Sequence, residues 1–280
     1  MMHLSSEQVI ARLKQLPSLP SAVSEVLASF GNEDVDVDTI AHQIARDQAL
    51  TARVLRVANS SFYGLQTKVG TIHEAVVILG FRAVRSMVLA VGMNGAFRGD
   101  QCPGFDAPAY LRHGAGVALA ARSLAPLMGQ SPELAFTAGL LHDIGVLVLA
   151  SSFARQYAEA LAYRKQHDCF VVEAERTVLG IDHAEVGGLL AETWRFPASI
   201  REAIAYHHSP ADASEDSLAN LIHVADATTR ALGLSGAANE MVPPLDPIAW
   251  KRIGADWDAY VQVLPQVERD FEETCQMVSA

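Results

Sequence analysis

The stretch Ala135–Ala150 reads AFTAGLLHDIGVLVLA and places His142 and Asp143 side by side within an apolar run. Burying a histidine without a hydrogen bond is unfavourable, and burying a carboxylate is far more so unless its charge is compensated. His142 is in helical register with Ala138 and Gly145, and Asp143 follows about 100° further round the helix. The stretch therefore predicts a buried helix whose two polar groups need compensation, either by a metal ion or by hydrogen bonds.

Signals for helix ends recur along the chain and define the fold class. Thr71 and Glu74 form a capping box, and Gly80 stands where a C-terminal glycine stop is expected. Ser131 followed by Pro132 is typical of a helix N-terminus. Sustained alternation of apolar and polar residues, the signal of a half-buried strand, is not found. The sequence predicts an all-α protein.

Two irregular segments divide the predicted helices. The loop Arg98–Phe105 is rich in glycine and proline, and the segment Gly233–Pro247 contains three prolines and precedes the C-terminal helices. We expect those helices around 246–253 and 256–278. The expected organisation is an N-terminal helical subdomain over 1–100, a second helical subdomain over 104–232 and a helical extension over 233–280.

The composition indicates a globular protein with a large core, since 50% of the residues are hydrophobic and 19% are charged. A net charge of −11 argues against nucleic acid or an anionic membrane as a partner. The stretch Arg46–Arg85 is locally basic, which favours a solvated helix surface. We expect no membrane span, because no apolar run approaches roughly 20 residues. No secretory signal is apparent, and three dispersed cysteines suit a reducing cytoplasm, where we expect the protein.

Buried polar groups recur in four further segments with helical patterns. In each segment a histidine or aspartate is in helical register with small or aliphatic residues, which predicts that it lies on the buried face of its helix. A single buried histidine is usually satisfied by a backbone carbonyl or a hydroxyl. Several such groups are unfavourable as scattered core residues, whereas one or two cations compensate them together. The candidate metal ligands are His113, His142, Asp143, His183, His207, His208 and Asp226.

The other histidines are weaker candidates. His223 precedes Asp226 by three residues, and its pattern suits packing or support of a ligand as well as ligation. The remaining histidines are expected at the surface or in local packing: His3, His42, His73 and His167.

The donor atoms of these residues narrow the choice of metal ion. Without thiolates a structural zinc–thiolate site is excluded, and the many nitrogen donors argue against Mg²⁺ or Ca²⁺. Imidazole with carboxylate suits divalent transition metals, with Fe or Mn favoured and Zn, Ni or Co as alternatives. Seven ligands suit two ions about 3.5–4 Å apart, bridged by a carboxylate and a hydroxide.

The order of these residues resembles that of a known superfamily. The pattern His113, His142-Asp143, Asp226 is similar to the HD metal-dependent phosphohydrolases, and His183 with His207-His208 resembles the additional ligands of their binuclear HD-GYP branch. Three N-terminal stretches resemble the HDOD domain, an HD-related output domain, over about residues 10–230. These stretches are Leu16–Pro20, Ala45–Gly64 and Ile72–Arg82.

The HDOD resemblance implies a bacterial cytoplasmic protein of signal transduction, built from an HDOD-specific helical bundle and an HD-type bundle. Many HDOD proteins have lost the metal ligands, whereas every ligand position that maps onto this chain is filled. The chain also departs from active HD-GYP enzymes. Val146 stands where they have a lysine after HDIG, no GYP motif follows His208, and Ala109 stands where some relatives have a glutamate for a third metal.

Two functions remain open at this point. The first is a regulatory HDOD protein with an intact binuclear metal site, whose partners are signalling proteins or a small phosphorylated ligand. The second is an enzyme, a phosphohydrolase of phosphomonoesters or phosphodiesters, in which Asp143 is the bridging ligand of the metal-activated water. A third and simpler account is a metal-free cluster of hydrogen-bonded histidines. Lys165, Arg195 and Arg201 are substrate-binding candidates by nearness in sequence only, and the apolar cluster Val84–Met93 suits either internal packing or a homodimer interface.

Overall fold

The computed structural model describes residues 3–16, 21–29, 36–59, 65–94, 97, 102–237 and 240–278. Within these residues the regular elements are helices and no strand occurs, which confirms the predicted all-α class. The helices are α1 (Ser6–Leu13), α2 (Ser21–Ala28), α3 (Val37–Arg46), α4 (Gln48–Ala58), α5 (Ile72–Leu79), α6 (Phe81–Asn94), α7 (Ala107–Leu124), η3 (Ala125–Met128), α8 (Pro132–Leu141), α9 (Ile144–Ser152), α10 (Ala154–His167), α11 (Val171–Leu179), α12 (His183–Thr193), α13 (Ala198–Tyr206), η4 (Pro210–Asp212), α14 (Leu218–Ala231), α15 (Pro247–Ile253) and α16 (Trp257–Val278).

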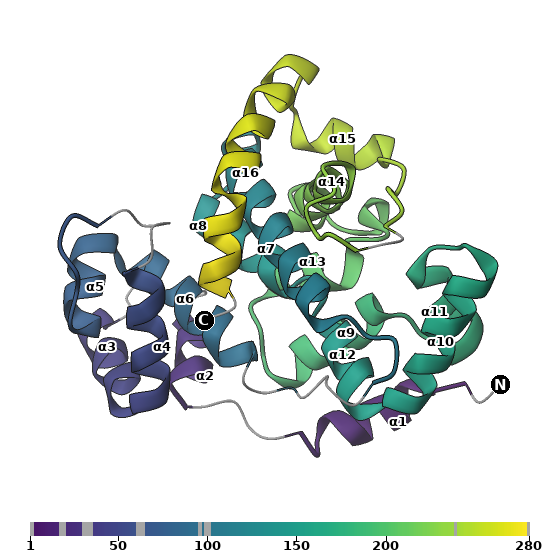
Figure 1. Ribbon diagram of the computed structural model, residues 1–280, viewed down its shortest axis with the longest axis horizontal. Coiled ribbons are helices and arrows are strands. Elements are labelled where there is room, and N and C mark those ends of the chain that lie inside the picture. Colours follow the sequence, from purple (N-terminus) through teal and green to yellow (C-terminus); the bar gives the residue numbers. More distant parts are fainter. Residues whose placement is uncertain are drawn as a thin grey trace.

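Helices α2 to α6 pack together on one side of the molecule, and the later helices form a larger bundle around α7 (Figure 1). Helix α6 packs against α8 and so joins the two groups. Helix α1 lies apart from α2 to α6 and packs on α12. Just before α1, the backbone N–H of Leu4 donates to the carbonyl of Leu179, the last residue of α11, at 2.6 Å. The C-terminal helix α16 lies along α7 and covers the bundle.

The local helix signals act as the sequence predicts. Thr71 caps α5 in a full capping box with Glu74, and Gly80 ends that helix with a φ of 85°. Ser131 caps α8, whose first residue is Pro132. The expected helices at 246–253 and 256–278 are α15 and α16.

The stretch Ala135–Ala150 is not the single continuous helix that its pattern predicts. Helix α8 ends at Leu141 and α9 begins at Ile144, so His142 and Asp143 form a turn between them. Taken together, Pro132–Ser152 is long and apolar enough for a membrane span by composition, contrary to the expectation from the sequence. Its most apolar window is 78% buried within the protein, as a core segment is.

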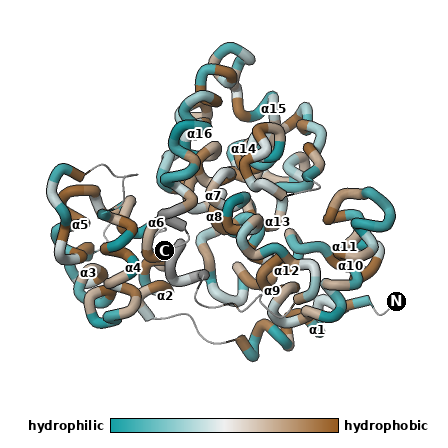
Figure 2. The backbone as a smooth tube through the Cα atoms, in the orientation of Figure 1, coloured by the Kyte–Doolittle hydropathy of each residue, from teal (hydrophilic) through white to brown (hydrophobic). Residues whose placement is uncertain are grey.

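Apolar residues of α6 point into the protein. Val84, Met87, Val88 and Leu89 are at most 1% exposed, so this part of the cluster Val84–Met93 packs internally. The outer helices α10, α11 and α16 alternate between hydrophilic and hydrophobic residues along their length (Figure 2).

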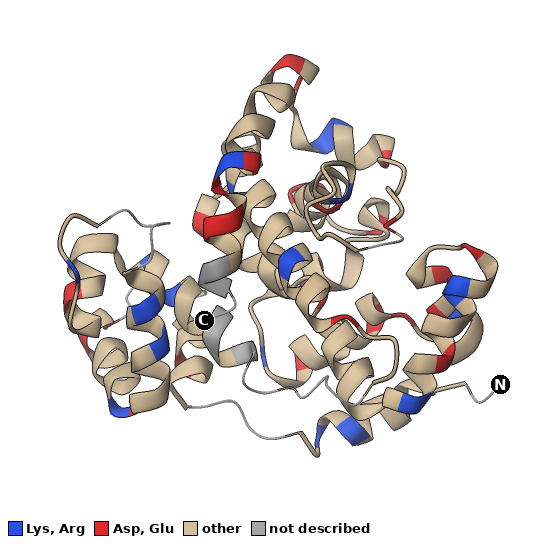
Figure 3. Ribbon diagram, in the orientation of Figure 1, with Lys and Arg blue, Asp and Glu red and all other residues tan. Residues whose placement is uncertain are grey.

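Positions of Lys and Arg and positions of Asp and Glu are spread over helices throughout the molecule (Figure 3). Arg46, Arg53 and Arg56 are exposed, as expected for a solvated helix surface, whereas Arg85 is partly buried. Burial and the nearby Arg82 lower the pKa of Arg85 to about 10.

Parts of three sequence features lie outside the described residues. They are positions 17–20 of the stretch that begins at Leu16, positions 60–64 of the stretch that begins at Ala45, and positions 98–101 of the expected boundary loop.

Candidate metal centre

The structure brings all seven candidate ligands to one place inside the larger bundle. Five segments far apart in the sequence supply them, and six of the side chains are buried while His208 is half-buried. His113 comes from α7, His142 and Asp143 from the turn between α8 and α9, His183 from the start of α12, His207 and His208 from the turn after α13, and Asp226 from α14.

The turn between α8 and α9 places the two central residues. Gly145 follows it and lies against α12, where an added Cβ would stand 1.9 Å from the carbonyl oxygen of His183 and 2.7 Å from the nitrogen of Gly187. Glycine therefore permits a backbone approach that any side chain would block. This close contact sets Asp143 beside His183, a residue 40 positions later in the chain.

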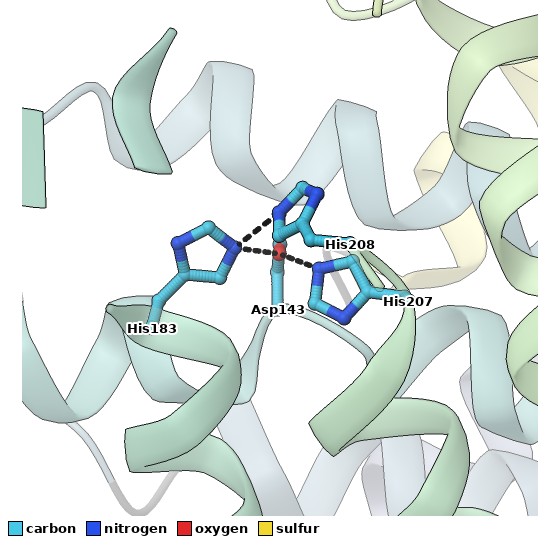
Figure 4. A group of neighbouring side chains, drawn as sticks. All are labelled: Asp143, His183, His207 and His208. Carbon is cyan, nitrogen blue, oxygen red and sulfur yellow. Dashed lines mark hydrogen bonds and ion pairs between the residues drawn. The ribbon is translucent and has the colours of Figure 1, made fainter. Parts of the chain in front are cut away.

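The carboxylate of Asp143 lies at the centre of the cluster. Its Oδ1 is 3.1 Å from Nε2 of His183 and 3.4 Å from Nε2 of His207, as Figure 4 shows. Its Oδ2 faces the other way, 3.3 Å from Nε2 of His142 and 3.7 Å from Nε2 of His113. The ligand atoms thus form a first group of His113, His142 and Asp226 and a second group of Asp143, His183, His207 and His208, each within a span of 4.8 Å.

Three of the central atoms have no hydrogen-bond partner among the described residues. They are Nε2 of His142, Nε2 of His207 and Oδ1 of Asp143, and all three are buried. Leaving such atoms unsatisfied costs about 1–3 kcal/mol each. Donor atoms about 3 Å apart also match the spacing of ligands that each lie about 2.1 Å from a shared ion. The residues therefore fit a divalent metal, and a purely hydrogen-bonded cluster accounts poorly for these three atoms.

Hydrogen bonds to the far side of the imidazoles orient them. Nδ1 of His142 donates to the carbonyl of Gly139 at 2.7 Å, and Nδ1 of His207 donates to the carbonyl of Ile204 at 2.8 Å. Because a carbonyl only accepts, each of these rings carries a proton on Nδ1. In its neutral form each ring then presents the lone pair of Nε2 to the centre of the cluster. Metal-binding histidines are held in the same way.

Three supporting residues near the cluster were not predicted as such. Glu175 is fully buried, and its Oε2 accepts from both the backbone N–H of His183 at 2.9 Å and Nδ1 of that residue at 2.6 Å. Arg230 donates from Nε to Oδ1 of Asp226 at 2.8 Å, and Glu240 lies beside it with Oε1 3.7 Å from Nη1. The sequence carries a signal for two of the three, because Arg230 follows Asp226 by four residues and Glu175 is in register with apolar positions of α11.

The structure also settles the role of His223. Its Nδ1 donates to the carbonyl of His207 at 2.8 Å, and its Nε2 accepts from the backbone N–H of Asp246 at 3.0 Å. Both ring nitrogens are engaged, so His223 supports the ligand turn and is not itself a ligand here. The three predicted substrate-binding cations have no contact with the cluster in the structure, and Arg201 lines a separate hollow of about 530 Å³ between α1, α12 and α13.

The two carboxylates are held in their charged form. Burial raises the pKa of Asp143, but the imidazoles of His142 and His183 together lower it by a larger amount. The pKa therefore lies well below its ordinary value. Burial also raises the pKa of Asp226, but the guanidinium of Arg230 and the imidazole of His113 together bring it well below its ordinary value. The cluster therefore contains two buried carboxylates in their charged form.

The histidines of the second group differ in their electrostatics. Burial lowers the pKa of His183, but the carboxylates of Glu175 and Asp143 together raise it well above the ordinary value. Burial and the neighbouring His207 place the pKa of His208 well below it. An incoming cation therefore meets one imidazole that must lose a proton and another that is already neutral.

The fold and the cluster define a helical protein with a candidate metal centre of the HD type. The family model for the HDOD domain matches residues 16–210, and the chain belongs to this family.

Known proteins resemble the chain along most of its length. A candidate phosphohydrolase of known structure from Shewanella amazonensis SB2B is 29% identical, with a TM-score of 0.77 and coverage of 96% of this chain and 97% of that one. A candidate signal transduction protein of known structure from Marinobacter aquaeolei VT8 shares the fold at 23% identity, with a TM-score of 0.82 and coverage of 100% of this chain and 63% of that one. An uncharacterized protein of Treponema pallidum (strain Nichols) is 27% identical over 209 residues. This match covers 73% of the present chain and only 40% of the length of that relative.

Proposed function

We propose that the protein is a regulatory HDOD protein of bacterial signal transduction that carries an intact binuclear metal site. The observation that carries the proposal is the gathering of seven ligand side chains, Asp143 among them, in two adjoining groups, with three buried ligand atoms that have no other partner among the described residues. Its partners would be cytoplasmic signalling proteins or a small phosphorylated ligand, and not nucleic acid or a membrane, because the chain is acidic.

The ligand groups assign the residues that would hold each ion. Asp143 would bridge through its two oxygens, and each group of histidines would complete one ion with neutral Nε2 atoms. The donor set favours Fe or Mn, with Zn, Ni or Co as alternatives. Bound ions would cross-link five segments, from α7 to α14, and so tie the stability of the whole bundle to metal occupancy.

A regulatory role fits the surroundings of the cluster better than a catalytic one does. Six of the seven ligands are at most 7% exposed, which leaves little access for a bulky substrate. Arg230 contacts the cluster, but its guanidinium already pairs with Asp226 and lies near Glu240. Val146 replaces the lysine of the HDIGK motif, and it is a core residue at 6% exposure.

A second candidate function is a metal-dependent phosphohydrolase, favoured by the 29% identity to the candidate phosphohydrolase from Shewanella amazonensis SB2B. When bound, two ions would supply Lewis-acid activation of a phosphate ester and of water. The chain's own contribution would be to hold those ions through Asp143 and to orient Nε2 of His142 and of His207 toward them through the Nδ1 hydrogen bonds. Half-buried His208 marks the most accessible side of the cluster.

One set of measurements separates these functions. The purified protein is analysed for bound metal and assayed with a generic aryl phosphodiester, with and without added Mn²⁺, beside His142→Ala and the control His167→Ala. His167 is an exposed residue stacked on Tyr163, so its loss leaves the cluster intact. Bound metal without turnover supports the regulatory role, whereas turnover that is lost only in His142→Ala supports the enzyme. Protein without metal, even after exposure to Fe²⁺ and Mn²⁺, refutes both.

A further inference from the structure

The two ligand groups differ in their contact with Arg230. Its side chain is 17% exposed and lies on α14, one turn after Asp226. Nε donates to Oδ1 of Asp226 at 2.8 Å, and Nη2 lies 3.2 Å from Nε2 of His113. A guanidinium has donors and no acceptor. It therefore engages the same two atoms that an ion in the first group would need.

The second group has no such competitor among the described residues. Oδ1 of Asp143 and Nε2 of His207 lack hydrogen-bond partners, and the Nε2 atoms of His183 and His208 lie 2.9 Å apart. The ion pairs of Asp143 in the structure are with histidines, and Arg230 acts on this carboxylate only through longer-range charge. An ion in the second group replaces a contact between two imidazoles, and the proton that it displaces from His183 can leave to solvent. An ion in the first group must instead displace the guanidinium of Arg230, which keeps its charge.

We propose that the two metal sites are unequal, and that Arg230 keeps the first group (His113, His142 and Asp226) as the weaker one. The inference rests on the proposed binuclear site and adds how its occupancy is controlled. The second group takes an ion first. The first group takes an ion only when the guanidinium moves away, because two cations at such short range repel each other strongly in a buried site.

Glu240 supplies a second place for the guanidinium. Its Oε1 lies 3.7 Å from Nη1 of Arg230 and 3.8 Å from Nδ1 of His113, and its Oε2 accepts from Ser235 at 2.7 Å. Glu240 belongs to the irregular segment between α14 and α15. Filling the first group would therefore shift Arg230 from Asp226 toward Glu240. Binding of an ion in the first group would in this way change the contacts of the irregular segment between α14 and α15.

The test is a calorimetric titration of the full chain, stripped of metal with a chelator, using Mn²⁺ as the only ligand. The wild-type protein should bind one ion tightly and a second at least about tenfold more weakly. Arg230→Met and Arg230→Gln should each strengthen the second ion at least about tenfold and leave the first unchanged, whereas Arg230→Lys, which keeps the charge, should not. Glu240→Gln should weaken the second ion, because the guanidinium loses its alternative partner.

Arg112→Met is the matched control. Arg112 precedes the ligand His113 on α7 but pairs with Glu272 on α16, at 2.9 Å between Nη2 and Oε1. Its loss should change neither affinity. Equal affinities for the two ions in the wild-type protein, or a second affinity that neither neutral variant of Arg230 changes, would overturn the inference while the proposed function stands. Wild-type protein that binds no Mn²⁺, Fe²⁺ or Zn²⁺ would instead refute the proposed function itself.

Discussion

Replacing Gly145 with alanine puts a methyl carbon into the contact between α9 and α12. The new Cβ would lie 1.9 Å from the carbonyl oxygen of His183 and 2.7 Å from the nitrogen of Gly187, both of which are backbone atoms that no rotamer change can move. Reaching even a tight contact of 3.0 Å needs a shift of roughly 1 Å between the two helices. Overpacking of this kind costs about 3 kcal/mol or more when backbone must move.

We therefore expect Gly145→Ala to lower the melting temperature by roughly 6–12 °C, at about 2–4 °C per kcal/mol for a chain of this size. The same shift separates Nε2 of His183 from Oδ1 of Asp143, which are 3.1 Å apart, so the variant should also lose metal. Melting is followed by circular dichroism with a chelator present, so that the helix contact is measured apart from metal binding. Metal content is then measured on protein purified without the chelator.

Gly114→Ala is the control, because an added Cβ on this buried residue of α7 would meet only the carbonyl of Leu140 at 3.8 Å. Alanine inside a helix is favoured over glycine by about 0.5–1 kcal/mol, so this variant should keep or slightly raise the melting temperature. A Gly145→Ala protein that melts with the wild type and retains its metal would refute the close approach of α9 and α12.

Three further measurements address the cluster. Glu175→Ala should weaken metal binding about 10–100-fold, because His183 loses the carboxylate that orients it. Glu175→Gln should weaken metal binding less, and a competition assay against a chromophoric chelator measures both effects. Metal affinity should rise with pH by up to about tenfold per pH unit, because the raised pKa of His183 means that a proton must leave before an ion binds. A calorimetric series from pH 6 to 8 in which the affinity does not rise would contradict this expectation. Removing the metal should lower stability by about 2.7 kcal/mol relative to protein at a metal concentration of 100 times Kd, and equal melting curves with and without chelator would exclude a structural role for the ions.

The sequence by itself determined the helical class and the chemistry of the cluster. Caps such as Thr71 with Glu74 act within a few residues, so they can be identified before any tertiary contact is known. The register of His113 and Asp226 with apolar neighbours likewise showed that these polar groups are buried, since helical period alone decides which face a residue occupies.

Only the tertiary structure decided how those faces meet. Periodicity carries no information on distances between helices, so neither the 3.1 Å approach of His183 to Asp143 nor the packing of α1 on α12 follows from it. The break at His142 could not be predicted either, because two apolar helices joined by a short turn have the same composition as one continuous apolar helix. Arg230 shows the limit most clearly. Its spacing from Asp226 is that of a pair within one helix, and only the packing of α7 against α14 brings its guanidinium to His113.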